Sequence, residues 1–332
     1  MERSDESRVG RGMNSLTNNS PRDAKGWLSV FIKGMAMGVA DLVPGVSGGT
    51  VAFITGIYDE LLSTLAGLQF GLIRDLFRSK EGLSFVSRLR RIWHRSNMSF
   101  MVVLLLGVLT SVGLFAGVLH HMLIHHPERL WAFFFGLVAA SIPLVGREAR
   151  WTASEWVLAV VGVALAGFLT SLPPMAGSDA PQVLMACGAV AICAMILPGI
   201  SGSFILLLLG AYGSVIGALK SLDVIRIAAF GFGAVLGLLT FSRLLDKLLE
   251  NKRNQTLAML TGFLLGSLNA LWPWKSKVEL LYVHSDGREE WFKTNTWPVD
   301  LATHEWLWAV VLVLLGAILV TLLGRWGKQP TT

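Results

Sequence analysis

Charged residues are scarce in this sequence. Only 15% of its 332 residues are Asp, Glu, Lys or Arg, whereas 53% are hydrophobic and the mean hydropathy is +0.59. This composition excludes an ordinary soluble globular protein, because a surface in contact with water needs many more polar side chains. The apolar runs continue into the C-terminal region, which predicts a protein that crosses a membrane several times.

Cysteine is almost absent, and no metal motif takes its place. Cys187 and Cys193 lie inside one apolar stretch, so neither a disulfide framework nor a cysteine-ligated metal is predicted. The histidines at 120, 121, 125 and 126 have no accompanying carboxylate motif, and we expect no metal there. No cofactor is predicted. The net charge of +6 does not indicate nucleic acid, because in a membrane protein basic residues report the sidedness of loops.

Long apolar runs define the predicted membrane segments. Spans are predicted at residues 98–120, 129–145, 156–172, 226–245, 255–272 and 305–324. Two further apolar stretches, 27–66 and 182–219, are interrupted by Pro44-Gly45 and Pro198-Gly199. Because proline and glycine end helices, each stretch is predicted to be a helical hairpin that enters and leaves the membrane on one side.

Basic residues indicate the orientation of these segments. With the spans placed as above, 20 of the 28 Lys and Arg residues lie on one side, which the positive-inside rule assigns to the cytosol. The tail 1–26 has no apolar core, so no cleavable signal is predicted, and it is expected to be disordered and cytosolic. The tail 325–332 is also predicted to be cytosolic, in a multi-pass protein of the bacterial inner membrane.

Two loops have a predicted structure of their own. Loop 67–98 places Phe85, Leu89 and Trp93 at helical spacing among arginines, which predicts either a surface helix on anionic lipid or an ordinary basic loop. Outer loop 273–304 contains two short strand patterns around Ser285-Asp286-Gly287, which predict a small β-hairpin.

The sequence contains an internal repeat. VPGVSGGTVAFITGIY at 43–58 matches LPGISGSFILLLLGAY at 197–212, 154 positions later, and FFFGLVAASI at 133–142 resembles MLTGFLLGSL at 259–268. Each half, 27–172 and 182–324, therefore contains one hairpin and three spans. An odd number of crossings inverts the second half, so the two hairpin tips should meet near the middle of the membrane. The predicted fold is an all-α polytopic membrane protein of two inverted repeats with re-entrant hairpins.

Small and hydroxylated residues fill both predicted tips, and their backbone N–H groups are suited to bind an anion at the start of a helix. The candidate phosphate-binding residues are Gly45, Ser47, Gly48, Gly49 and Thr50 in the first tip and Gly199, Ser201, Gly202 and Ser203 in the second. Two such tips in hydrocarbon would suit a phosphate whose apolar tail stays in lipid. The alternative is that these small residues only allow helices to pack closely.

Two acidic residues and two tyrosines complete the candidate site. Asp41 precedes Pro44 at the end of a buried half-helix, and its repeat counterpart is Met195; it is a candidate proton carrier or the partner of a basic residue. Glu60 is a second candidate for ion coupling, or an ordinary solvated carboxylate. Tyr58 and Tyr212 each follow the tip serine by eleven residues, which predicts either a lining of the transport path or interfacial anchors.

The motifs DLVPGVSGGT, YDELL and LPGISGSFILLLLGAY, at 41–50, 58–62 and 197–212, resemble those of the bacterial and archaeal polyprenyl phosphate transporter family. The resemblance covers residues 27–324. It implies a flippase that returns undecaprenyl phosphate, the carrier lipid of cell-wall glycan assembly, from the outer to the cytoplasmic leaflet. The implied partners are this lipid phosphate and the surrounding membrane lipids. The sequence indicates no oligomeric state.

Two other functions remain open at this point. The tips also resemble the PGxSRSxxT stretch of integral undecaprenyl diphosphate phosphatases, but Gly48 and Gly202 occupy the arginine position. Without that arginine or an ExxxE motif the hairpins lack the cation and carboxylates that phosphoryl transfer needs, which argues against an enzyme. A transporter of a small soluble anion would use the same backbone groups.

Overall fold

A computed structural model describes residues 22–43, 45–68, 85–175, 177–283, 289–297 and 303–327. Most of the N-terminal tail predicted to be disordered lies outside these residues, but its last residues, from Ala24, are helical. Outside the described residues also lie most of the basic loop before Phe85, Pro44, the turn at 285–287 and most of the C-terminal tail. The first half contains α2 Ala24–Asp41, α3 Gly48–Ile54, α4 Tyr58–Gly67, α6 Phe85–Arg95, α7 Met98–His125, α8 Pro127–Gly146 and α9 Ala153–Ser171. The second contains α10 Pro181–Ile196, α11 Gly202–Leu208, α12 Tyr212–Ser221, α13 Val224–Asn251, α14 Arg253–Ser267, β1 Lys275–Val283, β2 Glu289–Asn295 and α15 Thr303–Gly327.

Membrane-spanning helices dominate the described part of the chain. Five of them, α7, α8, α9, α13 and α15, are long and apolar enough to cross a membrane, or six if the bent pair α11 and α12 is counted as one span. The predicted span at 255–272 is wrong in its extent. Helix α14 has 15 residues, Arg253–Ser267, and the apolar segment continues beyond it in turns at 268–271, so the helical part is shorter than predicted.

Each predicted hairpin has two breaks instead of one. The first separates α2 from α3 and α10 from α11, at the Pro-Gly positions, and the second separates α3 from α4 and α11 from α12. Gly45 and Gly199 have φ of 88° and 92°, and Gly56 and Gly210 have φ of 72° and 67°. These left-handed conformations favour glycine, because a Cβ atom would clash with the backbone. Each pair is 154 positions apart, so the repeat extends to the backbone conformation.

Glycines allow the main helix pairs to pack closely. These pairs are α2 with α7, α10 with α13, α8 with α15, and α9 with α14. A Cβ atom built on Gly34 would lie 2.3 Å from the Leu104 carbonyl oxygen, and one on Gly188 would lie 2.4 Å from that of Phe230. Such contacts bring helix backbones together, as small residues do in membrane proteins. Gly34 and Gly188 are 154 positions apart, so both halves use equivalent contacts.

One helix offers a direct test of this packing. A Cβ on Gly233 in α13 would lie 1.8 Å from the Met185 carbonyl oxygen, whereas one on Gly231 would meet none of the residues that the structure describes within 4 Å. We expect Gly233→Ala to destabilise the protein by about 1–3 kcal/mol through overpacking, and Gly231→Ala to have little effect. Thermal unfolding in detergent measures both. Equal unfolding midpoints for the two variants would contradict the close packing of α10 and α13.

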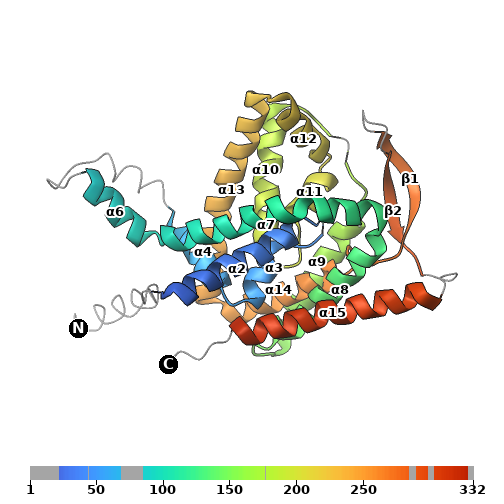
Figure 1. Cartoon of the computed structure of the whole chain (residues 1–332), viewed down its shortest axis with the longest axis horizontal. Coiled ribbons are helices and arrows are strands. Elements are labelled where there is room, and N and C mark those ends of the chain that lie inside the picture. Colours follow the sequence, from blue (N-terminus) through green and yellow to red (C-terminus); the bar gives the residue numbers. More distant parts are fainter. Residues whose placement is uncertain are drawn as a thin grey trace.

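The two predicted loop elements are present. Helix α6 occupies Phe85–Arg95, and β1 and β2 form an antiparallel two-stranded sheet. The fold is therefore mostly helical with one small sheet. Figure 1 places α6 and the C-terminal end of α15 at the left and the two strands at the right, so these elements lie at opposite ends of the molecule.

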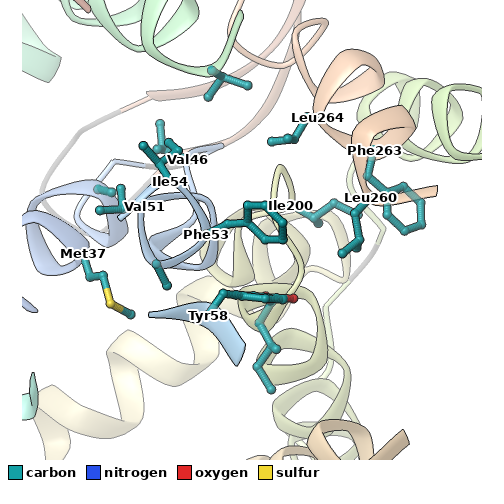
Figure 2. Close-up of a cluster of buried hydrophobic side chains, with 14 of the residues drawn as sticks. Met37, Val46, Val51, Phe53, Ile54, Tyr58, Ile200, Leu260, Phe263 and Leu264 are labelled. Carbon is teal, nitrogen blue, oxygen red and sulfur yellow. The ribbon is translucent and has the colours of Figure 1, made fainter. Parts of the chain in front are cut away.

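The buried core surrounds the broken helices of the first half. All seven residues of α3 are buried, whereas α11 buries three of its seven. Figure 2 shows Phe53 and Tyr58 beside Ile200 and Leu260, which come from the other half. The rings of Phe53 and Tyr58 are 5.2 Å apart between centroids. The core therefore holds the first tip and brings it against the second half.

Candidate functional site

The two predicted tips are in direct contact. The Gly199 N–H donates to the Thr50 hydroxyl oxygen at 3.0 Å. The Ser47 hydroxyl lies 2.9 Å from the Met195 carbonyl oxygen and 3.1 Å from that of Leu197. These are bonds between residues almost 150 positions apart in the chain. The tips are therefore joined by hydrogen bonds at the break in each half.

Tyr58 extends this contact from the start of α4. Its hydroxyl donates to the Ile196 carbonyl oxygen at 3.1 Å, and its side chain is buried. Carbonyl groups at the end of a helix have no partner within it, so Ser47 and Tyr58 together satisfy the end of α10. Residues of the first hairpin therefore cap the C-terminal end of α10, the first helix of the second half.

The carboxylate of Asp41 occupies the start of α3. The Gly48 N–H donates to its Oδ1 at 2.7 Å, and the Gly49 N–H donates to the Ser47 hydroxyl oxygen at 3.1 Å. The sequence predicted bare N–H groups here, and this prediction is wrong for Gly48 and Gly49 in this conformation. The carboxylate of Asp41 and the hydroxyl of Ser47, both from the adjoining chain, accept the hydrogen bonds that were predicted for an anion. The backbone, rather than a basic side chain, is the hydrogen-bonding partner that the structure shows for Asp41.

Fewer side-chain groups accept hydrogen bonds from the start of α11, in the second tip, than from the start of α3. Ser201 is the N-cap of α11 but makes no side-chain cap hydrogen bond, and its hydroxyl lies 2.9 Å from that of Ser203. Met195 replaces the carboxylate of the first half and lies against Gly202, where an added Cβ would be 3.2 Å from Met195 Cβ. The helix start without a side-chain cap is therefore in the second tip.

The two tyrosines occupy different environments. Tyr58 is 3% exposed, whereas Tyr212 is 37% exposed. The predicted same-face spacing from Ser47 to Tyr58 assumed one continuous helix, but α3 ends at Ile54 and α4 begins at Tyr58. The second break in each hairpin was not predicted from the sequence, although the recurrence of Gly56 at Gly210 indicates it.

Ion pairs hold the N-terminal end of α4. Glu60 pairs with Arg22 and accepts a hydrogen bond from the Asn97 side chain at 2.8 Å. Asp59 lies 2.9 Å from Arg253. At the other end of α4 the Arg243 guanidinium donates to the Leu68 carbonyl oxygen at 3.0 Å. Glu60, a predicted coupling residue, therefore lies in a network that fixes the position of α4.

Stability measurements can test the asymmetry of the tyrosines. Tyr58→Phe leaves the buried Ile196 carbonyl without its hydroxyl partner, so we expect it to lower the free energy of unfolding by about 1–3 kcal/mol. Tyr212→Phe removes an exposed hydroxyl and should change that free energy by less than about 0.5 kcal/mol. Thermal unfolding in detergent compares the two. A larger loss in Tyr212→Phe would mean that the contact at Ile196 contributes little.

Comparison with known proteins gives the relationships of this chain. Residues 37–289 match the VCA0040-like family, described as undecaprenyl phosphate translocase-like. The chain belongs to this family. It is 38% identical over 309 residues to the polyprenyl-phosphate transporter of Vibrio cholerae serotype O1, covering 91% of this chain and 98% of that protein. It is 30% identical over 267 residues to the polyprenyl-phosphate transporter of Staphylococcus aureus, covering 74% and 86% respectively.

No solved structure matches the chain significantly. Family membership, together with the five apolar helices of spanning length, identifies a multi-pass membrane protein. The family match includes both tips, α4 and the bent pair α11 and α12. The elements that meet at the centre of the molecule therefore lie within the part of the chain that defines the family.

Proposed function

We propose that this protein is a flippase that carries undecaprenyl phosphate from the outer to the cytoplasmic leaflet of the bacterial inner membrane. The observation that carries the proposal is the hydrogen-bonded meeting of two broken helical tips, Ser47 to Met195 and Thr50 to Gly199. Helices broken at a repeat interface are where secondary transporters bind their substrates. The relatives named as polyprenyl-phosphate transporters support a lipid phosphate as substrate and transport without cleavage.

Matching elements support two inverted repeats with re-entrant hairpins. Packing of α2 with α7 corresponds to that of α10 with α13, and packing of α8 with α15 corresponds to that of α14 with α9. The second correspondence exchanges elements between the halves, which a two-fold relation requires. With the basic residues on the cytosolic side, α6 and both chain ends would face the cytosol and the strands β1 and β2 would face outward.

The phosphate binds between the two tips in this proposal. Donors come from the backbone and hydroxyls of both tips, at Gly45, Ser47, Gly48, Gly49, Thr50, Gly199, Ser201, Gly202 and Ser203. The second tip receives the headgroup first, because Ser201 makes no side-chain cap on α11. At the first tip the phosphate must displace the Asp41 carboxylate from the Gly48 N–H. The polyprenyl tail stays in lipid throughout.

Asp41 is the proposed coupling residue. An ionised carboxylate competes with phosphate for the same N–H group and repels it, whereas a protonated carboxyl does neither as strongly. Uptake of a proton by Asp41 would therefore favour phosphate binding at the first tip. Glu60 contributes by holding α4, which begins with Tyr58, against Arg22.

Purified protein in liposomes tests the function. Labelled undecaprenyl phosphate is incorporated, and the headgroup that becomes accessible to an impermeant reagent is followed over time. Inorganic phosphate released from undecaprenyl diphosphate is assayed in parallel. We expect faster exchange between leaflets and no phosphate release. Phosphate release would instead identify a phosphatase, and the absence of both signals would favour a carrier of a small soluble anion.

A further inference from the structure

The contacts of the two halves are unequal, although their elements match. Helix α3 packs against α8, α10 and α15, whereas in the described residues α11 has no comparable packing against α14, α2 or α9, the elements that correspond to these. Helix α4 packs against α13, but its counterpart α12 has no comparable packing against α7. Figure 1 shows α12 at the top of the view, where it packs against α13. The first hairpin therefore packs against helices whose counterparts do not pack in the same way against the second hairpin.

The hydrogen bonds show the same inequality. Tyr58 donates to the Ile196 carbonyl oxygen, and the positions 154 residues away are Tyr212 and, for Ile196, Leu42. Tyr212 is 37% exposed, and the Ser201 hydroxyl contacts Ser203 instead of the end of α2. The second hairpin therefore has the residues for an equivalent contact but does not make it.

Open glycine faces lie on the two helices that would meet. A Cβ built on Gly113 or Gly117 of α7, or on Gly213 or Gly217 of α12, meets no atom of the described residues within 4 Å. Each pair has the four-residue spacing that places small residues on one helix face and allows close helix packing. Gly117 corresponds to Arg243 in the second half, 126 positions later, and Arg243 contacts α4. The corresponding surface on α7 therefore lies open.

We propose that the two halves exchange these roles, so that the protein alternates between the present arrangement and a second one. In the second arrangement α12 packs against α7 through the open glycine faces, and Tyr212 donates to the Leu42 carbonyl oxygen. Tyr58 then releases Ile196, and α4 leaves α13. The exchange opens the tips alternately to the two ends of the molecule, which transport through a fixed central site requires.

Distances between spin labels test the exchange without measuring transport. The labels are placed on a background of Cys187→Ala and Cys193→Ala. One pair, Gly67→Cys with Leu244→Cys, reports α4 and α13. The matched pair, Ser221→Cys with Val118→Cys, occupies the corresponding positions of α12 and α7. All four positions are exposed. Distances are measured in lipid nanodiscs, with and without undecaprenyl phosphate, at acidic and neutral pH.

We expect two populations whose proportions change in opposite directions for the two pairs. The Ser221–Val118 distance should shorten as α12 approaches the spacing of packed helices, about 10 Å between axes, while the Gly67–Leu244 distance lengthens. A single long Ser221–Val118 distance under every condition, or parallel changes in both pairs, would overturn the proposal. The alternation itself is argued from contacts in the structure, and only its role depends on the proposed transport function. Opposite changes without lipid exchange in liposomes would leave the alternation standing and remove the proposed substrate.

Variants distinguish the two arrangements. Tyr212→Phe should lower the population of the second arrangement about two- to tenfold, as loss of one hydrogen bond would, and Tyr58→Phe should lower that of the first to a similar extent. Gly113→Leu combined with Gly117→Leu should remove the short Ser221–Val118 population. Gly167→Leu, on α9 and also in open space, is the control. An equal response to the control and the α7 double variant would refute docking of α12 on α7.

Discussion

Gly202→Leu should reduce lipid exchange by the purified protein about ten- to a hundredfold. Its added side chain would enter the start of α11, where a Cβ lies 2.8 Å from the Ala191 carbonyl oxygen and 3.2 Å from Met195 Cβ. Overpacking of this size costs about 1–3 kcal/mol, and the leucine would also cover the N–H groups proposed to bind phosphate. The liposome exchange assay measures the loss.

Gly48→Leu gives the matching test in the first tip. A Cβ there lies 2.5 Å from an oxygen of the Asp41 carboxylate, so the side chain would displace that carboxylate and fill the same position. Gly231→Leu, which meets open space, controls for the added bulk. Thermal unfolding of each variant separates lost transport from lost folding. Near-normal exchange by well-folded Gly48→Leu and Gly202→Leu proteins would show that phosphate does not bind between the tips.

Asp41→Asn should abolish the response of transport to a pH gradient. The amide keeps an oxygen that can accept the Gly48 N–H bond at the position of Oδ1, so the local structure should be retained. The amide cannot take up or release a proton at physiological pH, so exchange should no longer accelerate when a gradient is applied. The measurement compares lipid exchange in liposomes with and without the gradient.

Asp59→Asn provides the control for loss of a carboxylate. Its side chain is 58% exposed and pairs with Arg253 at the surface, where such pairs contribute little. We expect this variant to keep the gradient response. A normal response in Asp41→Asn would exclude Asp41 from coupling, and a loss in Glu60→Gln alone would transfer that role to Glu60.

The sequence predicted the positions of helices, strands and helix breaks better than it predicted the tertiary contacts. Repeated Pro-Gly positions predicted the first break in each hairpin, and the pattern in 273–304 predicted the two strands. The pattern around Phe85 allowed either a helix or a basic loop, and the structure has helix α6. The second break was missed because Gly56 is a single glycine without a neighbouring proline, although its recurrence at Gly210 indicated it and the positive φ of both residues confirms it. Helix α14 was predicted too long because hydropathy does not distinguish helix from the apolar turns after Ser267.

The contact between the two tips was predicted, and so was the difference between Asp41 and Met195, whereas the difference in packing between the tips was not. Matching sequences at 43–58 and 197–212 predicted equivalent tips, yet only the first is capped by Asp41 and buried throughout α3. A repeat in sequence specifies which contacts each half can make. Which half makes these contacts depends on the relative free energies of the alternative tertiary arrangements.

The packing of α8 with α15 and of α9 with α14 also determines how the protein can be assembled. In each of these pairs the second helix begins at least 82 positions after the first one ends, at Arg253 after Ser171 and at Thr303 after Gly146. After insertion, α8 and α9 stay without their packing partners, α15 and α14, until these helices have been synthesised. Neither half can therefore complete its fold alone, and loss of the last helix would leave Gly136, which approaches the Val313 backbone, without the partner on which the first half depends.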